Sequence, residues 1–386
     1  MSEARYPAVF WRMCAGALLF FLSFNLMLSE LPDALRRLGA PELLGWIIPS
    51  FALSALAARP LSGWLTDRLG RKWAMIGGTV FCVVAGVLYP LAGTVFFFFL
   101  VRVLHGFSTG FAPTGFSAFT TDVIPAQSRG EALGWQGLFS NLGTALGYSA
   151  GSWMVLQWGS RNMYLSSSVM AVLAVLLFLT LPETRPKQVH HPFSLRDVFY
   201  PAAWQPALIM CLVCIPLGAL LTVMPDFTTS MGFSNKGLYL GFYVACSLLV
   251  RIFSGRLSDR LGRPLGTAIG SLCQLLSLLC LLLPSKVPDM QFAFFLSAVL
   301  YGIGQGFNAP ALFAWAGDLS TSQNRGRALA MLFIALETGI IIGGLGGGYL
   351  LAATGSFALI FGLGAVFAAL AFVLSIAAGK SIKKGH

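Results

Sequence analysis

Twelve long apolar stretches constrain the fold of this chain more than any other feature. Each approaches the roughly 20 residues that an α-helix needs to cross the hydrocarbon core of a bilayer. Within lipid, every backbone N–H and C=O must be hydrogen-bonded inside the protein, and a helix achieves this with its own backbone. The stretches cover residues 12–35, 43–65, 73–92, 95–117, 131–153, 163–182, 206–225, 237–257, 265–284, 291–314, 328–351 and 356–378. They predict an all-α membrane protein with twelve transmembrane helices.

The composition supports a surface that faces lipid. Of the 386 residues, 56% are hydrophobic and only 10% are charged, whereas a soluble domain carries about 25% charged residues. The net charge of +11 could suggest binding to nucleic acid, but the basic residues lie in short loops between the apolar stretches. In such loops they act as determinants of membrane topology. We therefore expect a lipid bilayer around the protein and no nucleic-acid partner.

The distribution of basic residues sets the expected orientation. If the N-terminus is in the cytoplasm, most Lys and Arg residues fall on the cytoplasmic side of the membrane. The exceptions that fall outside are Arg36, Arg37, Arg161, Lys236 and Lys286, and Arg102 falls within a span. This asymmetry predicts that both termini are cytoplasmic. The first apolar run continues into Glu30 without a small-residue cleavage site, so we expect a retained helix rather than a signal peptide. We expect a monomeric, multi-pass protein of a bacterial-type cytoplasmic (inner) membrane.

A polar decapeptide occurs once in each half of the chain. Residues 63–72 read Gly-Trp-Leu-Thr-Asp-Arg-Leu-Gly-Arg-Lys, and residues 255–264 read Gly-Arg-Leu-Ser-Asp-Arg-Leu-Gly-Arg-Pro. Other landmarks repeat at a near-constant offset, including Asp122 with Asp318. The glycines at 143, 147 and 151 repeat in the same way at 339, 343 and 347. Agreement at several places indicates that the two halves arose by duplication.

This basic, glycine-bounded turn between two spans, present once per half, resembles the loop 2–3 and loop 8–9 signature of the major facilitator superfamily. The chain looks most like the drug/metabolite:proton antiporter branch of that family. The resemblance implies two pseudo-symmetric six-helix bundles, residues 1–182 and 206–386, joined by a cytoplasmic linker at 183–205. It also implies a substrate site near mid-membrane, between two repeats that rock about it.

The resemblance gives the repeated loop a role as a conformational latch. In the family this cluster holds the two halves in the outward-open state. The matching residues are Gly63, Asp67, Arg68, Arg71, Gly255, Asp259, Arg260 and Arg263. Each aspartate follows its glycine by four residues, so the two share one helix face at the cytoplasmic end of a span. The alternative is that the basic residues of the loop only enforce topology.

Ionisable residues within the spans are candidates for function, because a charge in hydrocarbon is costly. The candidates for proton coupling are Glu30, Arg102, His105 and Glu337. Glu30 and Arg102 fall at similar predicted depths, so an ion pair between them is geometrically possible. Arg102, with Gly106 four residues later, also resembles the family's helix-4 motif associated with proton coupling. The alternatives are a solvated interfacial carboxylate for Glu30 and structural roles for the other three.

Neutral polar residues on the predicted spans could recognise a polar substrate. They are Asn25, Gln136, Asn141, Tyr301, Gln305 and Asn308. Hydrogen bonding between helices is the alternative role for them. The glycines at 143, 147 and 151 fall where drug–proton antiporters of the superfamily carry a Gly-rich motif, although Gly147 is followed by Tyr148 rather than proline. Close helix packing is the alternative for these glycines.

Neither a zinc-protease motif nor a nucleotide-binding motif is present. The sequence contains no HExxH or P-loop pattern, and its seven cysteines all fall within apolar stretches. We therefore expect neither enzymatic activity nor a metal or other cofactor. The predicted function is secondary active transport: proton-coupled efflux of a small organic molecule, a drug or a metabolite, by rocker-switch alternating access. The alternative is a nutrient symporter or facilitator for a sugar, organic anion or amino-acid derivative.

Overall fold

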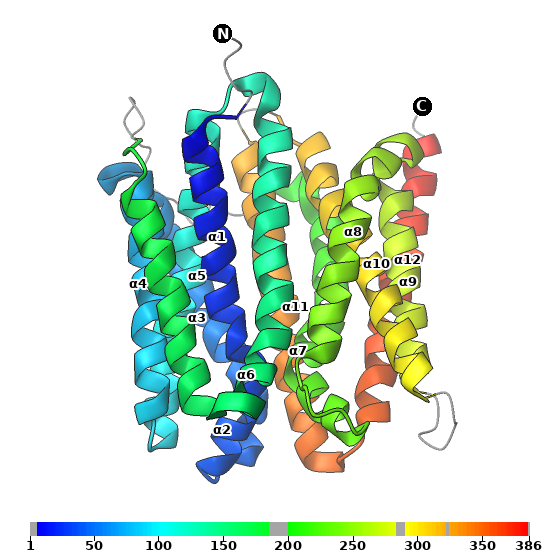
Figure 1. Ribbon diagram of the computed structural model, residues 1–386. Helices are drawn as coiled ribbons and strands as arrows, with labels where there is room; N and C mark the ends of the chain where they lie inside the picture. Colours follow the sequence, from blue (N-terminus) through cyan, green and yellow to red (C-terminus); the bar gives the residue numbers. More distant parts are fainter. Residues whose placement is uncertain (1–5, 185–199, 283–289, 322–323, 385–386) are drawn as a thin grey trace. The chain divides into compact units, whose positions relative to one another are not determined.

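The computed structural model describes residues 6–184, 200–282, 290–321 and 324–384. These residues form helices joined by short connections, and no strand occurs within them. The predicted all-α class is therefore confirmed (Figure 1). Most of the predicted linker, from residue 185 to residue 199, lies outside the described residues.

The chain divides into two compact units. The first unit contains residues 1–40 and 50–193, and the second contains residues 41–49 and 194–386. Each unit holds one copy of the repeated decapeptide. The short segment 41–49 groups with the second unit, which the sequence did not indicate. The domain boundaries expected from the sequence stay a prediction.

The first unit is a bundle of long helices. Its helices are α1 (Ala8–Leu26), α2 (Leu31–Arg37), most of α3 (Ile47–Leu69), α4 (Arg71–Leu88), α5 (Val95–Val123) and α6 (Arg129–Leu179), with 3-10 turns η1 (Leu28–Glu30), η3 (Tyr89–Leu91) and η4 (Ala126–Ser128). Gly70, with φ of 109°, separates α3 from α4. Fully buried aromatic side chains such as Phe20, Phe116 and Phe178 form its core.

Helix α6 contains two of the predicted spans. The sequence predicts spans at 131–153 and 163–182 with a loop between them, but the chain stays helical except at Gly159. That residue has φ of 82° and ψ of 162°, a conformation open to glycine because it has no Cβ. The turn between the two spans is therefore a single-residue break.

The described residues of the second unit form six long helices. They are α7 (Trp204–Ser230), α8 (Leu238–Leu261), α9 (Arg263–Cys280), α10 (Met290–Asp318), α11 (Arg325–Thr354) and α12 (Phe357–Lys384), preceded by the turn η6 (Pro201–Ala203). The 3-10 segment η2 (Pro41–Trp46) packs on α11 within this unit. A Cβ added at Gly45 would lie 3.2 Å from the carbonyl oxygen of Leu345, so this contact depends on a residue without a side chain.

The helices account for all twelve predicted spans. Ten helices of the described residues are long and apolar enough to cross a membrane. One of the ten is α6, which Gly159 divides into two spans. The 18-residue helix α9 is not among the ten, but it coincides with the predicted span at 265–284. The predicted twelve-helix fold is therefore confirmed.

Glycines allow α1 and α6 to pack closely in the first unit (Figure 1). A Cβ added at Gly147 would lie 2.7 Å from the Cβ of Asn25. A Cβ added at Gly151 would overlap the backbone carbonyl of Leu26. Small residues at such crossings let two helix backbones approach each other within a membrane. This run of glycines therefore serves close helix packing.

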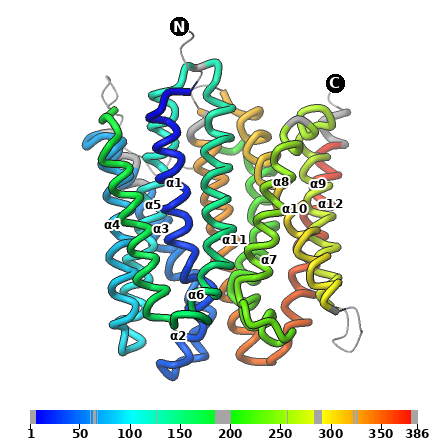
Figure 2. Tube along the Cα trace, in the orientation of Figure 1, coloured from blue at the N-terminus to red at the C-terminus, as the bar shows by residue number. Residues whose placement is uncertain are grey.

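The second unit repeats this arrangement with α7 and α11 (Figure 2). A Cβ added at Gly339 would lie 2.8 Å from the Cβ of Cys214, and one added at Gly343 would overlap the carbonyl of Ile215. A Cβ added at Gly347 would lie 3.1 Å from Ala219. The repeat found in the sequence thus corresponds to an equivalent helix crossing in each unit.

Candidate functional site

Arg102 is the centre of a buried polar site in the first unit. It lies on α5 within a span and is 1% exposed. Its guanidinium lies over the ring of Phe51 from α3, 4.5 Å from the ring centroid, which makes a cation–π contact. The phenol groups of Tyr89, Tyr148 and Tyr164 lie within electrostatic reach of this charge. The site is therefore built by four helical elements around one cation.

Two of these tyrosines hold each other in place. The rings of Tyr89 and Tyr164 stack with centroids 5.4 Å apart and planes 20° from parallel, which joins η3 to α6. Sequence analysis missed both residues as parts of a site. A tyrosine on an apolar span gives no sign of what its hydroxyl faces, so no sequence signal could have found them.

His105 follows Arg102 by one helical turn and is fully buried in an aromatic box. The rings of Phe24, Phe51 and Tyr89 lie 5.4, 5.6 and 6.0 Å from its ring centroid. Neither ring nitrogen has a hydrogen-bond partner among the described residues. Burying a charged imidazole in such surroundings is costly. A role for His105 in proton coupling stays a prediction.

Glu30 is buried rather than solvated. It closes the turn η1 and is 4% exposed. Ser152 on α6 donates a hydrogen bond from Oγ to Oε1 of Glu30 at 2.6 Å. Ser152 follows Gly151, whose missing side chain lets α1 and α6 meet. The helix crossing thus positions the hydroxyl that holds the carboxylate, while the expected ion pair between Glu30 and Arg102 stays a prediction.

The other candidate residues of the first unit make hydrogen bonds to neighbouring groups. Asn25 donates from Nδ2 to Oγ1 of Thr144 at 3.2 Å, linking α1 to α6. Thr120 donates to Oε1 of Gln136 at 2.9 Å, linking α5 to α6. Asn141 donates to a carbonyl of its own helix at 2.7 Å. These bonds fit polar packing between and within helices, and substrate binding by the three residues stays a prediction.

A neutral polar network lies in the core of the second unit. Gln274 on α9 donates from Nε2 to the hydroxyl of Tyr301 at 3.0 Å and accepts a bond from Nδ2 of Asn308 at 3.4 Å. All three side chains are buried. The sequence indicated the two residues on α10 but missed Gln274. Two other candidates belong to this unit: Gln305 on α10 is half-buried, and Glu337 on α11 is 9% exposed. Their predicted roles stay predictions.

The repeated loop forms an equivalent ion pair in each unit. In the first unit, Nε of Arg71 lies 2.9 Å from Oδ2 of Asp122. In the second, Nε of Arg263 lies 2.8 Å from Oδ2 of Asp318, and the same arginine also contacts Asp259. The sequence marked the two aspartates at 122 and 318 only as landmarks of the repeat. The structure brings each of them to the signature arginine of its own unit.

The latch itself stays a prediction. The backbone at Gly63 and Asp67 continues α3, but the Asp67 side chain lies outside the described residues. Arg68 and Arg260 are exposed at the ends of α3 and α8, and Gly255 lies within α8.

The two equivalent ion pairs should differ in strength. The side chain of Arg71 is 9% exposed, whereas that of Asp318 is 58% exposed. An exposed ion pair contributes less than about 1 kcal/mol to the free energy of unfolding, and breaking a more buried pair lowers that free energy further. Double-mutant cycles should give a coupling of ~1–3 kcal/mol for Arg71→Gln with Asp122→Asn, and less than ~1 kcal/mol for Arg263→Gln with Asp318→Asn. Reversible unfolding in micelles measures both couplings, and equal values would contradict the burial argument.

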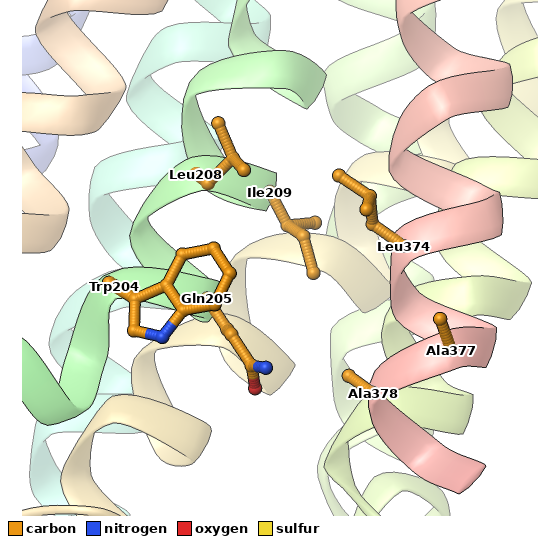
Figure 3. A pocket seen from close by; sticks show the side chains of 7 residues that line it. All are labelled: Trp204, Gln205, Leu208, Ile209, Leu374, Ala377 and Ala378. Atoms are coloured by element: carbon orange, nitrogen blue, oxygen red, sulfur yellow. The ribbon is translucent and has the colours of Figure 1, made fainter. Parts of the chain in front are cut away.

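A groove between α7 and α12 lies apart from these residues. It encloses about 160 Å³, with Trp204 and Gln205 on one wall and Leu374 and Ala378 on the other (Figure 3). Its lining is mostly apolar, and it includes none of the predicted site residues. It therefore adds nothing to the candidate site.

Comparison with known proteins identifies the family. The chain matches the Major Facilitator Superfamily over residues 13–290 and 237–381, and it belongs to that family. It is therefore a multi-pass membrane transporter and not an enzyme.

Relatives that match most of the chain include two bacterial proteins. The staphylopine export protein of Staphylococcus aureus (strain Mu50 / ATCC 700699) is 23% identical over 356 residues, which cover 87% of this chain and 87% of the relative. The multidrug resistance protein MdtG of Klebsiella pneumoniae (strain 342) is 26% identical over 329 residues, 81% of this chain and 79% of the relative. The solved structure of the nucleoside transporter NupG has a TM-score of 0.78 at 15% identity, covering 96% of this chain and 98% of its own. At that identity the likeness shows the fold alone.

Proposed function

We propose that this protein exports a small organic molecule from the cytoplasm in exchange for protons, by alternating access between its two six-helix bundles. The observation that carries the proposal is the buried carboxylate of Glu30, held by Ser152 in the unit that also buries Arg102. Two relatives that match most of this chain are named for export and for multidrug resistance, which supports the outward direction.

In this mechanism Glu30 carries the proton. A carboxylate that is alternately buried and reached by water binds its proton with state-dependent affinity, because desolvation disfavours the charged form. Such state dependence is what coupling to a proton gradient requires. A cationic or polar substrate would compete with the proton for the same carboxylate, so that binding of one promotes release of the other.

The membrane setting is part of the same proposal. The excess of basic residues in alternate loops supports an orientation with both termini in the cytoplasm. We place the protein in the inner membrane of a bacterial-type cell as a monomer, with the two bundles as its moving parts.

Everted membrane vesicles that are energised to be acidic inside test this function. With a panel of lipophilic cations, sugars, amino-acid derivatives and metallophores, we expect accumulation of at least one class. This accumulation should cease when the proton gradient is collapsed. Glu30→Gln should keep binding of a polar substrate, which the amide can still hydrogen-bond, but lose the pH dependence of transport. Glutamine can still accept the Ser152 hydrogen bond but has no titratable proton. Glu42→Gln, at an exposed carboxylate, should behave like the wild type.

Other outcomes would replace the proposal. Transport that does not depend on the proton gradient would indicate a facilitator. Accumulation of substrate by intact cells would indicate an importer. An unchanged pH profile in Glu30→Gln would leave Glu30 with a structural role and make Glu337 or His105 the next candidate.

A further inference from the structure

A separate pocket opens at one end of the first unit, where α2 ends, η3 lies and α6 breaks at Gly159. It encloses about 200 Å³. Its polar lining includes Arg37, Ser160, Arg161 and Tyr164, and Phe98 contributes to its apolar wall. Sites for drug-sized ligands usually enclose about 300–1,000 Å³. This pocket is therefore suited to a smaller chemical group.

Two cations, Arg37 and Arg161, line the pocket. Neither makes an ion pair or a side-chain hydrogen bond with any residue that the structure describes. Two carboxylates lie within electrostatic reach of Tyr164, but Asp33 pairs with Arg36 at 2.9 Å and Glu30 accepts a hydrogen bond from Ser152. No carboxylate is present among the described residues that line the pocket, so its lining is net positive.

The position of Arg161 has no explanation in helix stability. It lies in the first turn after the break at Gly159, and the positive end of a helix dipole disfavours a cation there. Arg37 differs, because it lies in the last turn of α2, where a cation is favourable. An anion bound between the two arginines would offset the unfavourable position of Arg161.

Tyr164 provides a buried hydroxyl that lacks a partner. The residue is 4% exposed, and its hydroxyl makes no hydrogen bond to any described residue. Leaving a buried hydroxyl unsatisfied is costly, so such a group indicates a missing partner. Tyr164 lines the pocket, and the stacking of its ring on Tyr89 fixes the orientation of the side chain. An oxygen of a bound anion would accept its hydrogen bond.

We propose that this pocket binds a phosphate-type anion. Arg37 and Arg161 supply the positive charge, and the Tyr164 hydroxyl donates a hydrogen bond to one oxygen of the anion. Arginine suits phosphate because the N–H donors of its planar guanidinium match the spacing of two phosphate oxygens. The group can belong to a phospholipid headgroup or to phosphate in solution. The pocket lies at the connections between predicted spans. The proposal goes beyond the transport function and does not depend on it.

Ligand-dependent thermal unfolding of the purified full-length protein in neutral detergent tests the site. The probes are phosphatidylglycerol, diacylglycerol with the same acyl chains, inorganic phosphate, and chloride at equal ionic strength. We expect stabilisation by a phosphate-bearing probe but not by diacylglycerol or chloride. The apparent Kd should rise about tenfold in Arg37→Gln and in Arg161→Gln, and more modestly in Tyr164→Phe. Arg36→Gln should bind like the wild type.

The outcomes are distinct. A response to phosphatidylglycerol alone assigns a lipid headgroup, and an equal response to inorganic phosphate assigns a dissolved anion. Arg37→Lys, which keeps the charge, should retain part of the binding and covers the case in which a glutamine variant does not fold. Equal stabilisation by diacylglycerol or chloride would overturn the proposal, as would unchanged binding in the double variant Arg37→Gln/Arg161→Gln. Because the measurement is of binding, failure of the export proposal would leave this result intact.

Discussion

Replacement of Arg102 with alanine should lower the rate of transport by about 2- to 30-fold, because a lost cation–π contact is worth ~0.5–2 kcal/mol and each 1.4 kcal/mol is tenfold. The guanidinium is almost wholly buried and lies over the ring of Phe51. Arg102→Lys keeps the charge but loses the planar contact with the ring, so its rate should fall between those of the wild type and the alanine variant. Initial rates in proteoliposomes measure the effect.

Two further variants make this result interpretable. Arg12→Ala removes an exposed arginine of α1 and should transport like the wild type once its folding is verified. Phe51→Leu removes the aromatic ring and should reproduce part of the Arg102→Lys defect. If Arg102→Ala transports at the wild-type rate, the buried cation has no part in the transport cycle.

The spans and their duplication could be predicted because they follow from local physical requirements. A backbone in lipid must form helices, so about 20 apolar residues suffice to identify a span. The glycines of α6 and α11 could be matched between halves because each occupies the same place in its own helix crossing. The cost of a charge within a span also indicated that Arg102 would be buried inside the protein, whereas its functional role stays a prediction.

The contacts across the bundle could not be predicted, because they depend on how helices are rotated and offset against one another. Nothing in the sequence indicated that Arg71 would pair with Asp122, 51 positions away. Ser152 follows a glycine in a small-residue run, and only the helix crossing shows that its hydroxyl reaches Glu30. The break at Gly159 was predicted as a loop because a single residue with positive φ has no distinctive pattern.

The two units share their loops but not their buried chemistry. Each has the ion pair between the signature arginine and an aspartate. The first unit buries the ionisable Glu30 and Arg102, whereas the second buries Glu337 and a neutral network around Gln274. Duplication therefore preserved the packing and the loops but not the buried polar side chains. Which unit carries the coupling step stays a prediction.

The glycine crossing that supports this site should tolerate no side chain. Gly151→Ala is expected to destabilise the protein by about 3 kcal/mol or more, since the added Cβ would overlap the carbonyl of Leu26 and overpacking typically costs 1–3 kcal/mol. Helix backbones can relieve this overlap only by moving apart, which would also carry Ser152 away from Glu30. Unfolding of the purified protein in micelles measures the loss of stability.

A matched substitution separates the effect of the helix crossing on stability from the effect of helix propensity. Gly137 lies in the same helix, and a Cβ there would meet nothing within 4 Å. Gly137→Ala should therefore be neutral or stabilising by up to ~1 kcal/mol, because alanine favours helix more than glycine does. Gly343→Ala and Gly346→Ala provide the equivalent pair on α11 of the second unit, where only the first meets a neighbouring backbone. If the two members of each pair have equal effects, close backbone approach does not hold these helices together. If only Gly151→Ala and Gly343→Ala destabilise the protein, the repeated glycines are needed for packing. Transport can be measured in the same variant: if Gly151→Ala retains pH-dependent transport, Glu30 functions without Ser152.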